Sequence, residues 1–78
     1  LQKAVAAKDD ALALTFLGFC YNNKAAQQQE PAEMKNLFEK AKKCFELARD
    51  LDPGQQRANW SYMLDNTNYN LERLNGAN

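Results

Sequence analysis

The stretch ALALTFLGFCY, residues 11–21, decides the fold. Leucines, a glycine and a tyrosine recur in it at three- and four-residue spacing, which is typical of one face of an α-helix. The apolar surface is extended around most of the helix by Leu12, Phe16, Phe19 and Cys20. We therefore expect this helix to pack on more than one side. Gly18 lies inside this pattern. A glycine in a helix interior costs about 1 kcal/mol relative to alanine, and we expect the close approach of a second helix to compensate for it.

The stretch LFEKAKKCFELARDLDP, residues 37–53, supplies that second helix. Apolar side chains take one face and charged side chains the other, which predicts a helix over residues 31–51. Pro31 suits the first position of a helix, and Pro53 with Gly54 ends it, because proline cannot continue a helix. The apolar face consists of Met34, Leu37, Phe38, Ala41, Cys44, Phe45, Ala48 and Leu51.

The rest of the chain predicts helical segments on either side of this hairpin. Residues 1–8 are rich in alanine and have the composition of the tail of a preceding helix. Asp9-Asp10 predicts a turn and cap before a helix over residues 10–28, because a carboxylate can accept the free N–H groups of a helix start. Residues 55–74 predict a last helix that caps the domain.

Two boundaries stay open on the sequence alone. The polar run at residues 22–30 either extends the first helix, which its good helix formers favour, or forms a long loop. The run DNTNYN, residues 65–70, either continues the last helix, which the apolar stripe around it favours, or breaks that helix.

The helical patterns and the length of the chain together predict one small all-α domain. Ten basic and ten acidic residues among 78 give a formal net charge of zero, which does not suit a nucleic-acid-binding surface. No apolar run is long enough to span a bilayer, so we expect no membrane partner. The chain is too short for more than one small domain. It begins with Leu1 rather than Met, and we interpret it as a fragment of a longer protein.

Cys20 and Cys44 are the two cysteines, and the chain has no histidine. Two thiols without an imidazole make a poor metal site, and no motif for catalysis or phosphate binding is present. We therefore expect no metal, no cofactor and no enzymatic activity. Both thiols lie on apolar helix faces, where we expect them to be reduced and buried, with a disulfide between them as the alternative. The absence of a disulfide framework favours a reducing, cytoplasmic compartment.

The first of the two helices resembles the first helix of a tetratricopeptide repeat. In that family the motif is W-x-x-L-G-x-x-Y. Here Leu14-x-x-Leu17-Gly18-x-x-Tyr21 matches it, with leucine in place of tryptophan. The resemblance implies that Gly18 lies where the paired helices cross closely and that Tyr21 fills space between neighbouring repeats.

The second helix continues the resemblance. The family shows A-x-x-x-F followed by a proline after the helix. This pattern is matched by Ala41-x-x-x-Phe45, with Ala48 at the next small position and Pro53 as the terminal proline. The two motifs lie further apart than in a standard repeat, so the resemblance implies an insertion around residues 24–32.

The resemblance implies a right-handed α-solenoid fragment of antiparallel helical hairpins, and a function as an adaptor or scaffold in protein–protein interaction. In that family first helices line a groove that binds a peptide or a helix of a partner. The strip of the first helix that lines such a groove would carry Thr15, Phe19 and Asn22. The matching strip of the last helix would include Ser61 and Asp65. We expect these five residues to bind the partner.

The chemistry of that strip restricts the partner. It carries no lysine or arginine, so the grip on a C-terminal carboxylate used by some members of the family is not expected. Phenylalanine, threonine and asparagine suit an extended or helical peptide with an apolar anchor. Two alternatives are an internal structural segment of a larger solenoid, with self-association through exposed repeat faces, and a docking or regulatory domain of a multidomain enzyme.

Overall fold

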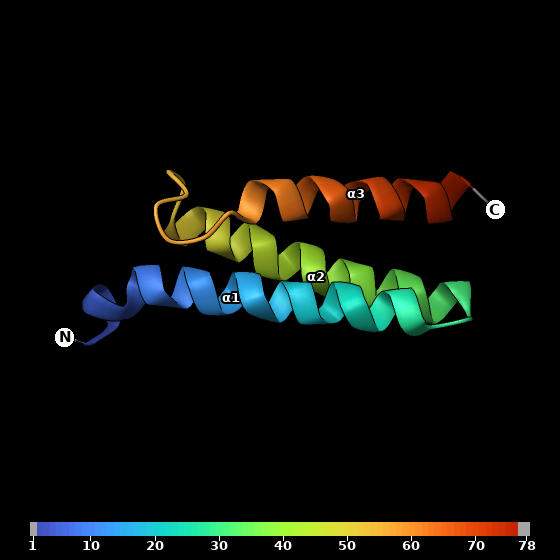
Figure 1. Ribbon diagram of the computed structural model, residues 1–78, viewed down its shortest axis with the longest axis horizontal. Helices are drawn as coiled ribbons and strands as arrows, with labels where there is room; N and C mark the ends of the chain where they lie inside the picture. The colour runs from blue at the N-terminus through green and yellow to red at the C-terminus, as the bar shows by residue number, and fades with distance from the viewer. Residues whose placement is uncertain (1, 77–78) are drawn as a thin grey trace.

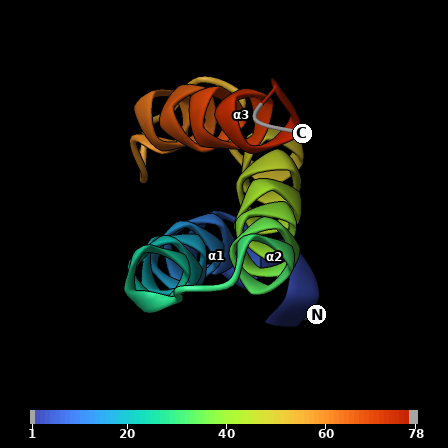
Figure 2. The same ribbon diagram turned by 90° about the vertical axis from the view of Figure 1, so that its right-hand side faces the viewer.

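The computed structural model describes residues 2–76, with the side chains of residues 10–76, and its architecture is all-α. It consists of α1 (Gln2–Gln27), α2 (Pro31–Leu51) and α3 (Trp60–Gly76), and no strand occurs in the described residues. Figure 1 shows α1 and α2 side by side and antiparallel, with α3 running back along α2. In the end-on view of Figure 2, α1 and α3 both lie against α2, and they contact each other little.

The pairing of α1 with α2 is the most extensive helix contact in the molecule. Gly18 faces Phe45 so closely that a Cβ atom added at Gly18 would lie 2.6 Å from Phe45 Cε1. Three alanines in the same cluster, Ala11, Ala41 and Ala48, are fully buried and add little bulk between the helices. The close approach expected at Gly18 is therefore confirmed, and the small side chains along this contact permit it.

The core is built along α2. In one cluster Phe45 packs with Trp60 and Leu64 of α3, and in the other Phe38 packs with Leu71 of α3 and an alanine of α1. Because residues of α2 contribute to both clusters, α2 positions both of its neighbours. Burial of these side chains supplies the main favourable term in folding.

One carboxylate organises the connection between α2 and α3. Asp52 is buried, and its Oδ1 accepts the backbone N–H of Gln56 at 3.0 Å. Its Oδ2 accepts the backbone N–H of Arg57 at 2.8 Å and that of Ala58 at 3.2 Å. The backbone carbonyl of Asp52 accepts the indole N–H of Trp60 at 2.7 Å. These bonds hold the connection in an irregular conformation and place Trp60 in the core as the first residue of α3.

Two expected helix starts differ from the structure. The turn expected at Asp9-Asp10 is not formed, because α1 continues through it as one helix from Gln2. The residues on both sides of this pair are good helix formers without glycine or proline, so the backbone has no reason to leave the helix there. The last helix begins at Trp60 rather than at residue 55, because the Asp52 carboxylate binds the preceding N–H groups. Gln55 also has a positive φ of 54°, which is not helical.

The two boundaries left open are settled in favour of helix. α1 continues to Gln27, and the short connection that follows is closed by the N–H of Gln28 bonded to the carbonyl of Ala25 at 3.1 Å. α3 runs without a break through residues 65–70 to Gly76. Pro31 stands at the start of α2, as expected from its fixed φ.

Candidate functional site

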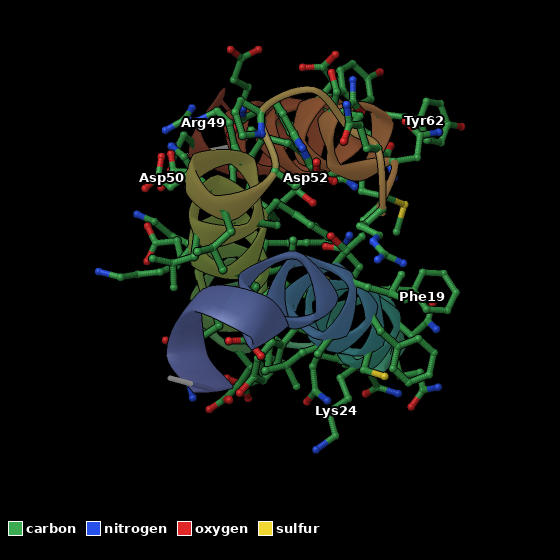
Figure 3. All side chains as sticks on the ribbon, turned by 90° about the vertical axis from the view of Figure 1, so that its left-hand side faces the viewer. Phe19, Lys24, Arg49, Asp50, Asp52 and Tyr62 are labelled. Carbon is green, nitrogen blue, oxygen red and sulfur yellow. The ribbon has the colours of Figure 1, made fainter. Side chains whose placement is uncertain are left out.

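A groove runs between α1 and α3, with α2 as its floor. Its main hollow has a volume of about 600 Å³. Met34 and the buried Phe38 form the floor, and Met63 extends the apolar surface onto α3. Figure 3 shows Phe19 of α1 and Tyr62 of α3 projecting on the same side of the molecule, and both line this hollow.

A second hollow of about 270 Å³ extends the groove along α1. Phe19, Tyr62 and Met63 line both hollows, so the two hollows adjoin along an apolar border. The second hollow adds Leu12, which is 52% exposed, and Phe16, which is 67% exposed. Exposed apolar side chains gathered around a concave surface are typical of a binding site.

Asparagines line both walls of the main hollow. Asn22 and Asn23 lie on the α1 wall, and Asn66 and Asn70 lie one helical turn apart on the α3 wall. Each amide offers a hydrogen-bond donor and an acceptor. Arg73 is the one residue with a formal charge among those that line the main hollow. The groove is therefore apolar at its floor and amide-rich at its walls, with a cation toward the end of α3.

One polar contact links α1 to α3 beside this groove. Thr67 Oγ1 lies 3.1 Å from Asn22 Oδ1 and 2.9 Å from the backbone carbonyl of Met63. A hydroxyl has a single proton, so it can be donated to only one of these oxygens. With the Asn22 amide turned by half a rotation, its nitrogen would donate to Thr67 Oγ1 while the hydroxyl donates to Met63. In the orientation shown, the buried Asn22 Nδ2 has no partner.

The structure brings together three of the five residues expected to bind a partner. Thr15 and Phe19 line the second hollow, and Phe19 and Asn22 line the main one. The Thr15 hydroxyl also donates to a backbone carbonyl one turn earlier, at 2.8 Å. Ser61 and Asp65 line neither hollow. The Ser61 N–H is bonded at 3.0 Å to a glutamine of the preceding connection, and Asp65 is exposed.

On α3 the groove uses a neighbouring strip that the sequence did not reveal. Tyr62 and Asn66 each follow an expected residue by one position, which rotates the strip by about 100° around the helix. The side of α3 that packs on α2 carries the buried Trp60, Leu64 and Leu71. This apolar stripe does not indicate which of its two flanking strips turns toward α1.

The two thiols differ in their surroundings. Both cysteines are free, but Cys20 is exposed, so the expectation of two buried thiols is wrong for Cys20. Cys20 lies on a surface of α1 that neither α2 nor α3 covers, whereas Cys44 is buried. Burial raises the pKa of the Cys44 thiol above its ordinary value of 9.0, because a thiolate is poorly solvated there.

Within residues 2–76, no three or more histidine, cysteine, aspartate or glutamate residues are placed to hold a metal ion. None of the described helices is both long and apolar enough to cross a membrane. Comparisons with protein-family models, with curated proteins and with solved structures find no match to this chain.

Proposed function

We propose that this chain is a tetratricopeptide-like protein-interaction module that binds a peptide segment of a partner protein in the groove between α1 and α3. The groove itself is the observation that carries the proposal. It offers about 600 Å³ above an apolar floor, with further exposed aromatic side chains along its length. A hollow of this size and composition can take a small number of apolar side chains from a ligand.

The helix arrangement supports the tetratricopeptide-like character of the module. Gly18 and Phe45 occupy the small and large positions of the two motifs, and they are in close contact. A third helix returns antiparallel to α2 and covers the same core. In a stacked helical array, this third element corresponds to the first helix of the next repeat or to a cap.

The amide groups on the walls favour an extended ligand over a helical one. A helix satisfies its backbone hydrogen bonds internally and presents mostly side chains. An extended peptide keeps free N–H and C=O groups, which need donors and acceptors when they are buried. Asn66 and Asn70 on α3, with Asn23 on α1, offer both. The ligand we propose is an extended segment with an apolar anchor above Phe38.

A display selection from random twelve-residue peptides tests this function. Peptides selected on the chain should be enriched in apolar anchors and should bind saturably at one site. Phe19→Ala should weaken their binding by about tenfold, because an aromatic contact in such a site is worth more than 1 kcal/mol. Asn66→Ala should weaken it as well, whereas Leu47→Ala, which removes an exposed side chain of α2 outside the groove, serves as the control. Peptides that bind equally well to wild type, Phe19→Ala and Asn66→Ala would refute the groove as the site.

A further inference from the structure

A stripe of exposed residues runs along α1 outside the groove and beside the contact of α1 with α2. Its members, Asp10, Ala13, Leu17, Cys20 and Lys24, follow one another at three- and four-residue steps, and all five are exposed. Such spacing places them on one face of a helix. Figure 3 shows Lys24 projecting from α1 away from the other two helices. The stripe is thus separate from the groove described above.

The centre of this stripe is apolar and partly open to solvent. Leu17 is 44% exposed, and it also lines a surface hollow with Lys40 and Lys43 of α2. The adjacent Phe16, which lines the second hollow of the groove, is 67% exposed. Between Asp10 and Lys24 the sequence has no charged residue on any face of α1. An uncharged helix surface with exposed large side chains is costly in water and marks an interaction surface.

The charges at the two ends of the stripe indicate what covers it. Asp10 and Lys24 each lie seven residues from Leu17, which is about 10 Å along the helix in either direction. A second, antiparallel α1 centred on Leu17 would place each Asp10 opposite the partner's Lys24. A parallel pairing would place Asp10 opposite Asp10 and Lys24 opposite Lys24, which is repulsive. The stripe is complementary to itself in one orientation only.

We propose that this stripe pairs with the same stripe of a second copy of the chain, forming a symmetric antiparallel dimer across Leu17. Ala13 and Cys20 flank the centre on either side, and their small side chains permit the two helices to approach closely. The two-fold symmetry places both Phe16 side chains on the same side of the pair, close to the axis. The five residues of the stripe line neither hollow of the groove, so the main hollow stays open in the dimer, whereas Phe16 connects the second hollow to the dimer contact.

The size of this surface predicts a weak dimer. One helix face per copy is at the low end of the areas that stable protein interfaces bury, so we expect dissociation in the micromolar range. Sedimentation equilibrium of the 78-residue chain from micromolar to millimolar concentration would measure it. A chain that stays monomeric throughout this range would overturn the proposal. It would indicate that the stripe binds a segment of a different protein and not a second copy of the chain.

Leu17→Asp tests the centre of the pairing. It places two carboxylates next to each other at the symmetry axis, and we expect the dissociation constant to rise by about a hundredfold or more. Tyr69→Asp is the control, because Tyr69 is an exposed aromatic residue on α3, 60% exposed, outside the stripe. Circular dichroism would verify that each variant is folded. A dimer whose dissociation constant is unchanged by Leu17→Asp would refute the stripe as the interface, whatever the effect of Tyr69→Asp.

A charge exchange tests the orientation without disturbing the fold, because both residues are exposed. Asp10→Lys or Lys24→Asp alone makes both end contacts repulsive, and each should weaken the dimer by about tenfold. The double variant D10K/K24D restores opposite charges in an antiparallel pair and should recover wild-type affinity at low salt. Failure of the double variant to recover would overturn the antiparallel arrangement, whatever the behaviour of Leu17→Asp.

Discussion

α1 meets its two neighbours in opposite ways. Against α2 it presents Gly18 and small buried alanines, and a phenylalanine ring fills the remaining space. Toward α3 it presents Phe16 and Phe19, which stay exposed, and one polar contact through Asn22. The same helix therefore has a closed side, where small residues let another helix approach, and an open side, where large residues border a groove. In α1 the small residues lie where the helix packs closely on α2, and the exposed phenylalanines lie where it borders the groove.

The largest expected effect tests this contrast with two phenylalanines. Phe45→Ala removes a fully buried ring from the closed side and should cost about 3–5 kcal/mol, which is enough to unfold a domain of this size. Phe16→Ala, on the open side, should change the free energy of unfolding by less than about 0.5 kcal/mol. Urea unfolding followed by circular dichroism, at a concentration where the chain is monomeric, measures both. Comparable losses for the two variants would contradict the distinction between the two sides.

The next effect concerns the loop that holds α3 away from α1. Asp52→Ala removes the acceptor of three backbone N–H groups, and it should cost about 2–4 kcal/mol because the buried N–H of Ala58 and the two partly buried N–H groups before it lose this acceptor. Asp52→Asn keeps one acceptor oxygen and should cost less. Trp60 is the single tryptophan and is buried, so its fluorescence reports on the docking of α3. An Asp52→Ala variant with unchanged stability and emission would show that the packing of Trp60 alone positions α3.

A smaller effect tests the polar contact on the open side. Thr67→Val preserves the shape of a fully buried side chain but leaves both ends of the Asn22 amide without a protein partner. We expect a loss of about 1–3 kcal/mol in the free energy of unfolding. Asn22→Leu combined with Thr67→Val should recover part of this loss, because both partners are then apolar. A double variant no more stable than Thr67→Val would indicate that the hydroxyl acts through Met63 instead.

The closed side could be predicted from the sequence, and the open side only in part. Gly18 inside an apolar helix pattern indicates close packing, because little else compensates a glycine there. The groove residues of α1 could be predicted, because they lie opposite a strongly patterned face. The groove residues of α3 could not, because the apolar stripe of that helix indicates its buried side but not which flanking strip turns toward α1. The start of α3 could not be predicted either, because Asp52 holds the preceding N–H groups. A buried carboxylate that accepts N–H groups several residues later leaves no periodic signal in the sequence.

The smallest expected effect is that of Gly18→Ala on the free energy of unfolding, and its sign depends on whether position 45 is phenylalanine or leucine. Gly18→Ala would place a Cβ atom 2.6 Å from Phe45 Cε1, and the fully buried ring has no room to move. Overpacking of this kind costs about 1–3 kcal/mol, while alanine gains about 1 kcal/mol in helix propensity, so the net loss is about 1 kcal/mol. In a Phe45→Leu background the contact is relieved, and Gly18→Ala should stabilise the chain by up to about 1 kcal/mol.

The double-mutant cycle over these two positions therefore has an expected coupling of about 2 kcal/mol, within the range of residues in direct contact. Leu12→Ala, measured in the same two backgrounds, is the control, because Leu12 lies on the open side and should show no coupling to Phe45. If Gly18→Ala were equally unfavourable with phenylalanine or leucine at position 45, the glycine would be required by the backbone of α1 itself. In that case the close packing of α1 on α2 would not depend on the contact between Gly18 and the Phe45 ring.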